Sequence, residues 1–266
     1  MRHVMVSLFL VCSLTAGFWA ERAAAAEEEA AAAAGNEWSF AIDATANTKY
    51  VWRGINLVDA PVFQPSVAAS YGGWTFAVWG NMETYNANTY GSHGQANGKF
   101  TEVDLTVEYA WDCGDWSFAV GVIHYIFPNT GFNNTTEVYG SVGYDCPLSP
   151  TITIYQDVDQ SHGTYITFGV SHTFEEVWKP TENTSMDIEI GTAVGWGSSS
   201  NNAFYYGATN SGLTDLTSSV GFPVGLGKGW TLKPAINHST LLDKNIQSNQ
   251  APDSNLWFGL SLSYEF

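Results

Sequence analysis

The feature that most constrains this chain of 266 residues is a two-residue alternation of apolar and polar side chains. This period is typical of a β-strand with one apolar and one polar face. It is clearest where Glu102, Asp104 and Glu108 alternate with valine and leucine. Twelve such runs follow one another, at 38–53, 62–71, 74–83, 100–111, 116–127, 136–144, 151–157, 164–174, 186–196, 213–224, 230–238 and 256–266.

The number and spacing of the runs favour a barrel that spans a membrane. Twelve is an even number, as in single-chain bacterial barrels, and most runs have the 9–11 residues that a tilted strand needs to cross a bilayer. Short connections, with 175–185 as an exception, alternate with longer polar ones at 84–99, 128–135, 197–212 and 239–255. The sequence therefore predicts an all-β fold, a twelve-stranded antiparallel transmembrane β-barrel over residues 37–266, with both termini periplasmic.

Aromatic residues gather at the predicted periplasmic ends of the runs, on the apolar face of each strand. Such a girdle is favoured at a bilayer interface, where an amphipathic ring can contact both lipid and water. A soluble sandwich would also alternate, but it gives no reason to collect rings at one end. The predicted girdle consists of Trp38, Tyr71, Trp74, Trp111, Trp116, Tyr144, Phe174, Trp230, Tyr264 and Phe266.

The start of the chain has the pattern of an export signal. Arg2 precedes an apolar core at 4–14, and small residues at 24–26 fit a cleavage site. We expect residues 1–26 to be a removed signal peptide and the Ala/Glu-rich residues 27–36 to be a tail. These features predict an exported protein of the bacterial outer membrane.

The charge is strongly negative, with 26 acidic and 9 basic residues. Nucleic acid is excluded as a partner, because its phosphates would be repelled. The parity of the strands turns several charged side chains inward, and an excess of carboxylates in a water-filled lumen favours cations. Alternatively, these carboxylates only solvate the lumen and pair with its few bases. The predicted pore-lining residues are Asp43, Lys49, Arg53, Glu102, Asp104, Glu108, Glu137, Asp187, Glu189 and Lys233.

Nothing in the sequence indicates an enzyme, a cofactor or a metal site. No compact pair of carboxylates suited to acid–base catalysis can be defined, and no histidine pair has the spacing of metal ligands. Cys113 and Cys146 lie in two predicted periplasmic turns. They can form a disulfide only if these turns lean together, and otherwise remain free thiols.

Several short motifs resemble the TorF-type porin family of bacterial outer-membrane proteins. They are Tyr50-Val51-Trp52-Arg53-Gly54, Gln64, Val78-Trp79-Gly80-Asn81, Glu102-Val103-Asp104-Leu105, Gly121 leading to Tyr125-Ile126-Phe127-Pro128, and Glu137-Val138-Tyr139. The likeness covers about residues 38–145, and the start of the chain, the loop 84–99 and the turn cysteines depart from it. The resemblance implies an outer-membrane barrel with channel activity, and no defined substrate.

The function predicted from the sequence is passive diffusion of small polar solutes through an outer-membrane porin, with a weak preference for cations. Inward rings such as Trp79, Tyr125, Tyr139, Tyr155 and Tyr165 would narrow the lumen. A barrel that does not conduct and binds a partner at its surface is the alternative, and a soluble sandwich is a further one. The expected partners are outer-membrane lipid, the solute, and the barrel-insertion machinery, which would recognise the final strand ending at Phe266.

Overall fold

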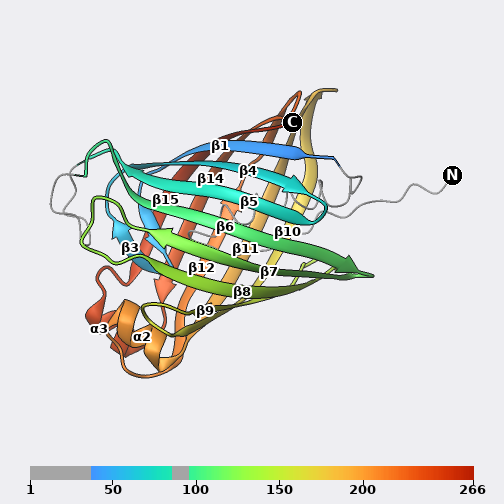
Figure 1. The fold of residues 1–266 in the computed structure, drawn as a ribbon. Coiled ribbons are helices and arrows are strands. Elements are labelled where there is room, and N and C mark those ends of the chain that lie inside the picture. The colour runs from blue at the N-terminus through green and yellow to red at the C-terminus, as the bar shows by residue number, and fades with distance from the viewer. Residues whose placement is uncertain (1–36, 86–95) are drawn as a thin grey trace.

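A computed structural model describes residues 37–85 and 96–266 (Figure 1). The expectations for residues 1–26 and 27–36 lie outside the described residues, as does most of the connection predicted at 84–99. Within the described part, neither helix is long and apolar enough to cross a bilayer.

The described residues form a closed, antiparallel barrel of twelve strands, as predicted. Each wall strand pairs with two neighbours, and β1 pairs with β15 to close the ring, with Ala41 opposite Glu265 and Asn47 opposite Gly259. The wall strands are β1 (Ser39–Asn47), β4 (Val62–Tyr71), β5 (Trp74–Glu83), β6 (Lys99–Cys113), β7 (Trp116–Ile126), β8 (Thr135–Tyr144), β9 (Thr151–Asp157), β10 (Thr164–Thr181), β11 (Thr184–Gly197), β12 (Gly212–Gly221) with β13 (Val224–Gly227), β14 (Trp230–Leu241) and β15 (Ser254–Glu265).

The wall departs from the simple pattern at two places. β12 and β13 pair with the same two neighbours, β11 and β14, so they are one wall strand interrupted at Phe222 and Pro223. Proline has no N–H for a strand ladder, which explains the break. The long connection predicted at 175–185 is wrong, because β10 and β11 extend as a hairpin that turns after Thr181.

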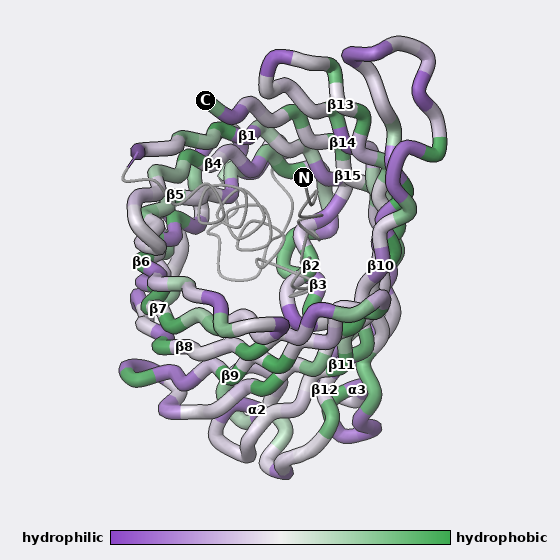
Figure 2. Tube along the Cα trace, turned by 90° about the vertical axis from the view of Figure 1, so that its right-hand side faces the viewer, coloured by the Kyte–Doolittle hydropathy of each residue, from purple (hydrophilic) through white to green (hydrophobic). Residues whose placement is uncertain are grey.

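The apolar face of the wall points outward. In β15, for example, Leu256, Phe258 and Leu260 are each about half exposed. Trp257, within this run, and Asn255 and Ser261, on either side of it, are buried. A soluble sandwich would bury its apolar faces between two sheets, so that alternative is wrong. Figure 2 shows the strands as a ring around a central space that contains β2 and β3.

The predicted aromatic girdle lies around the end of the barrel that carries the C-terminus, here called the terminus end. Rings on neighbouring strands contact one another, with centroid separations of 5.1 Å for Trp38 and Tyr71 and 4.8 Å for Trp116 and Tyr144. The same strand-to-strand contact recurs at 4.7 Å between Trp230 and Tyr264. The girdle therefore runs across several wall strands at one rim.

The opposite end, here called the loop end, carries most of the remaining structure. It contains the helices α2 (Ser199–Tyr206) and α3 (Lys244–Asn249), in the connections predicted at 197–212 and 239–255 (Figure 1). The strand predicted at 38–53 ends earlier, at Asn47. The chain then folds into the barrel as a small hairpin of β2 (Tyr50–Trp52) and β3 (Ile55–Val58), called the inner hairpin.

Candidate functional site: the lumen and its inner hairpin

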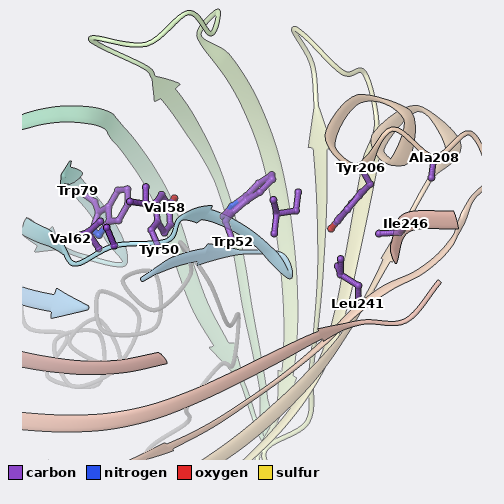
Figure 3. Close-up of a cluster of buried hydrophobic side chains, with 11 residues drawn as sticks. Tyr50, Trp52, Val58, Val62, Trp79, Tyr206, Ala208, Leu241 and Ile246 are labelled. Atoms are coloured by element: carbon purple, nitrogen blue, oxygen red, sulfur yellow. The ribbon is translucent and has the colours of Figure 1, made fainter. Parts of the chain in front are cut away.

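The inner hairpin is buried on both of its faces. Tyr50, Val51 and Trp52 are consecutive in the chain, and all three are less than a tenth exposed. A wall strand would leave every second side chain on the lipid side, so this segment cannot be part of the wall. Its apolar side chains share one cluster with Tyr206 and Leu241 at the loop end (Figure 3).

The tip of the inner hairpin fits closely against the wall. Gly54 has a φ of +80°, and a Cβ there would lie 2.6 Å from Leu241 Cδ2 and 2.8 Å from the Asp215 side chain. Only glycine adopts this backbone readily and leaves this space. The Tyr206 hydroxyl of α2 donates a hydrogen bond of 2.8 Å to the carbonyl of Arg53. Wall and helix thus hold the hairpin from one side.

Arg53 joins the inner hairpin to the opposing wall. Its two terminal nitrogens donate to the two carboxylate oxygens of Glu137 in β8, at 2.9 and 2.7 Å. The side chains are only 6% and 2% exposed. A buried ion pair with two parallel hydrogen bonds is strongly directional. Loss of either partner would leave the other charge buried without its counter-charge. We call the pair of Arg53 and Glu137 the latch.

Aromatic rings surround the guanidinium of the latch. The Arg53 Cζ atom lies 4.4 Å from the centroid of Trp52, 4.9 Å from Tyr155 and 4.1 Å from Tyr165. These separations fall within the range of cation–π attraction, which is stronger where water is excluded. Tyr155 and Tyr165 belong to β9 and β10, so the hairpin binds three consecutive wall strands.

Tyrosine hydroxyls hold many of the lumen carboxylates. Tyr50 donates to Glu102 at 2.9 Å and Tyr125 donates to Glu137 at 2.9 Å. A phenol satisfies a carboxylate oxygen without cancelling its charge, because it is neutral at physiological pH. These hydrogen bonds therefore add no positive charge to the lumen. The same pairing joins Tyr139 to Glu108, Tyr165 to Asp215 and Tyr205 to Asp157.

The inward bases predicted from the sequence are each engaged by a carboxylate. Besides the latch, Lys233 of β14 forms an ion pair with Glu189 of β11. Lys49 does not line the wall as predicted, because β1 has already ended. It lies at the base of the inner hairpin, where its Nζ is 2.7 Å from Asp59 Oδ1. Among the described residues, inward carboxylates nevertheless outnumber inward bases.

An amide ladder crosses four neighbouring strands at the level of the inner hairpin. Asn47 donates to Gln64 at 2.8 Å, Gln64 donates to Asn81 at 2.9 Å, and Asn81 donates to Thr101 at 3.0 Å. The ladder orders side chains on β1, β4, β5 and β6 without using charge. The ladder therefore adds uncharged polar groups to this part of the lumen.

The remaining predicted lining residues divide into two groups. Asp43 and Asp104 are buried on the inner face, at 8% and 6% exposure, and Asp104 Oδ1 has no hydrogen-bond partner in the described structure. Asp187 lies apart from them, where it accepts a hydrogen bond of 2.7 Å from the backbone N–H of Glu176 beside the extended hairpin of β10 and β11. The inward acids therefore do not form one continuous file.

Three buried acids were not predicted to be lumen residues. Glu83 and Asp157 continue the inward parity of their strands, so the sequence contained the signal that would have found them. Asp215 has no such signal, because Thr214 and Asp215 are adjacent and both buried. The register between β11 and β12 shifts at this point, and such an irregularity interrupts the alternation of faces.

Both turn cysteines are free thiols in the structure, with Cys113 exposed and Cys146 partly buried. The turns that carry them do not lean together into a disulfide.

A cavity of about 350 Å³ opens beside the inner hairpin, and we call it the outer chamber. One side is formed by Tyr50 and Trp52 of the hairpin, with Phe204 and Tyr205 of α2. Glu83 and Glu102, on the neighbouring strands β5 and β6, also line it. The other lining residues are Ile55, Leu57, Val58, Asn81, Thr101, Tyr125, Phe127, Thr130, Gly131, Phe132, Asn133, Thr135 and Gln160.

Comparisons of whole structures identify similar barrels. The KdgM porin has a TM-score of 0.51 and 12% sequence identity, and the match covers 85% of this chain and 99% of that one. The NanC porin has a TM-score of 0.50 and 12% identity, with coverages of 84% and 98%. LpxR from Salmonella typhimurium has a TM-score of 0.50 and 8% identity, with coverages of 85% and 99%. The likeness is one of fold.

The sequence itself matches no family model and no curated protein. The resemblance to the TorF-type porins therefore stays a prediction, and the functional argument depends on the geometry of the lumen.

Proposed function

We propose that the protein is a narrow channel of the bacterial outer membrane, which lets small polar solutes diffuse passively and prefers cations. An outward surface rich in half-exposed apolar side chains suits lipid better than water. The girdle at the terminus end suits a bilayer interface, and we place that end in the periplasm.

The observation that carries the cation preference is the balance of inward charge. Arg53, Lys233 and Lys49 are each engaged by a carboxylate. Further buried carboxylates, such as Glu102 and Glu108, accept hydrogen bonds from tyrosine hydroxyls, which add no positive charge, so the lumen carries an excess of acidic groups. A low-dielectric wall concentrates this negative potential along the lumen, which attracts cations and repels anions.

Planar-bilayer recording of the purified, refolded protein tests the proposal. Discrete current steps are expected, and in a KCl gradient the reversal potential should lie on the cation-selective side. A reversal on the anion side would contradict the cation preference while leaving the channel intact.

A second candidate function is a barrel that does not conduct. The inner hairpin favours this second candidate. The hairpin follows β1 in the chain, and the latch joins it to β8, so this segment extends across the lumen. Recording from the same preparation separates the two candidates, since a filled lumen gives no current steps.

A further inference from the structure

The outer chamber combines aromatic rings with acidic groups. Seven rings line it, contributed by the inner hairpin, β7, the following connection and α2. Some already contact one another, with centroid separations of 4.9 Å between Trp52 and Tyr205 and 5.9 Å between Phe127 and Phe132. The rings therefore come from two sides of the chamber and leave a space between them.

The charge of the lining has one sign. Glu83 and Glu102 are its ionisable acids, and none of the described residues that line the chamber is a lysine, arginine or histidine. The nearby cation, Arg53, is held outside the lining by the latch. The two acidic side chains of the described lining therefore lie beside aromatic rings, with no basic side chain among them.

The latch shows what this combination of groups binds. Immediately beside the chamber, the guanidinium of Arg53 is held by three ring faces and one carboxylate. Rings supply attraction for a weakly hydrated organic cation, and a carboxylate supplies the counter-charge. The chamber offers the same two kinds of group around an open volume at the low end of the range for small-molecule sites.

We infer that the outer chamber binds a small organic cation, such as a quaternary ammonium compound, between its rings and beside Glu102. This inference deepens the proposed channel function and rests on it for the role of the site in transport. A ligand of this class would enter from the loop end and occupy the chamber before it passes the inner hairpin. Binding itself does not require conduction.

Choline and its uncharged carbon isostere, 3,3-dimethylbutan-1-ol, test the inference directly. Each is titrated into the refolded protein in a non-ionic polyoxyethylene detergent, with binding followed by calorimetry. Choline should bind, and the isostere should bind at least about tenfold more weakly, because it lacks the charge. Equal binding of the two, binding of neither, or binding of the neutral sugar maltose in preference to choline would overturn the inference.

Variants locate the site. Phe132→Leu and Phe204→Leu remove half-exposed rings of the lining and should each weaken choline binding by roughly two- to fivefold. Glu102→Gln keeps an acceptor for the Tyr50 hydroxyl and should weaken binding by about tenfold. The matched control is Phe258→Leu, which alters a similarly exposed ring on the lipid side and should leave binding unchanged. Equal affinity in all four variants would place choline elsewhere and overturn the inference.

Bilayer recording separates failure of the inference from failure of the channel proposal. If the protein conducts, choline added at the loop end should reduce the potassium current, and Glu102→Gln should relieve this block. Conduction with no choline binding overturns the inference alone. Choline binding without conduction supports the site and overturns the channel.

Discussion

The two ends of the barrel are built by different means. At the terminus end, strands joined by short turns carry a girdle of half-exposed rings that contact their neighbours across the wall. At the loop end, the inner hairpin and two helices bury rings, carboxylates and the latch inside the wall. One end is thus suited to an interface with lipid, and the other narrows the path through the lumen. Selectivity should therefore be decided at the loop end.

Removal of the latch should have the largest effect on this contrast. Arg53→Ala leaves the Glu137 carboxylate buried without its counter-charge, which should lower the free energy of unfolding by about 3–5 kcal/mol. The inner hairpin should separate from β8 and single-channel conductance should rise. Urea unfolding in vesicles and bilayer recording measure the two effects.

The control for Arg53→Ala is Lys49→Ala, which removes the other base of the hairpin region. Its ion pair with Asp59 is solvent-exposed, with the Asp59 side chain 66% accessible, and should contribute no more than about 1 kcal/mol. If both variants conduct and unfold like the wild type, the latch does not hold the hairpin.

Gly54→Val should break the contact between the hairpin tip and the wall. The left-handed backbone there strains any β-branched residue by about 1–3 kcal/mol, and the new side chain would collide with Leu241. Gly72→Ala is the control, because Gly72 also has a positive φ but has nothing within 4 Å of its Cβ position. Only Gly54→Val should alter conductance; an equal change in both would attribute the effect to strain alone.

Loss of a girdle ring should affect stability without affecting conduction. Trp230→Ala removes a ring that contacts Tyr264 and should destabilise the barrel by about 1–2 kcal/mol. Trp230→Phe keeps an aromatic contact and should recover part of this loss. A change in ion selectivity with Trp230→Ala would contradict the expectation that selectivity is decided at the loop end.

The smallest expected effect concerns pH at the loop end. Asp243 caps α3, accepting from the backbone N–H groups of Asn245 and Ile246 at 2.7 and 3.3 Å. Burial raises the pKa of this carboxyl, but these hydrogen bonds and one from Asn210 outweigh it and lower the pKa overall. The cap therefore stabilises the folded state above the unfolded pKa of about 4 and loses this effect as pH falls through the folded pKa.

Asp243→Ala should lower the free energy of unfolding by about 1 kcal/mol at pH 7 and make less difference at pH 3. Asp243→Asn keeps a capping oxygen and should cost less. Urea unfolding at the two pH values measures the difference, and a larger loss for Asp243→Ala at pH 3 would reverse the expected sign.

The wall was predictable because successive side chains of each strand point alternately to the lipid and to the lumen, which gives the sequence a period of two. Alternation located all twelve strands and placed Glu102, Asp104, Glu108 and Glu137 on the inner face. The inner hairpin was missed because its partners are distant in the sequence, on β8 to β10, α2 and β14. Its one local signal was the apolar run of Tyr50 to Trp52, which lacks the alternation of a wall strand.

The sequence predicted which charged side chains point into the lumen, but not which of them contact one another. Pairing of the lumen bases with carboxylates was one of the two predicted alternatives, and the structure identifies Glu137 as the partner of Arg53. The roles of the tyrosine hydroxyls, the amide ladder and α2 depend on which strands face each other across the barrel. Side-chain alternation gives the direction of a residue but not its neighbour across the lumen.

The seam between β1 and β15 has a consequence for how the molecule is made. It joins the first described strand to the last. The ring is therefore completed by pairs of residues that lie very far apart in the sequence. Such topologies fold slowly, because the entropy of closing the chain is lost before the final pairing rewards it. Until that step, both seam strands present unpaired backbone edges, which invite aggregation. The ring therefore closes only once β15 is available to pair with β1.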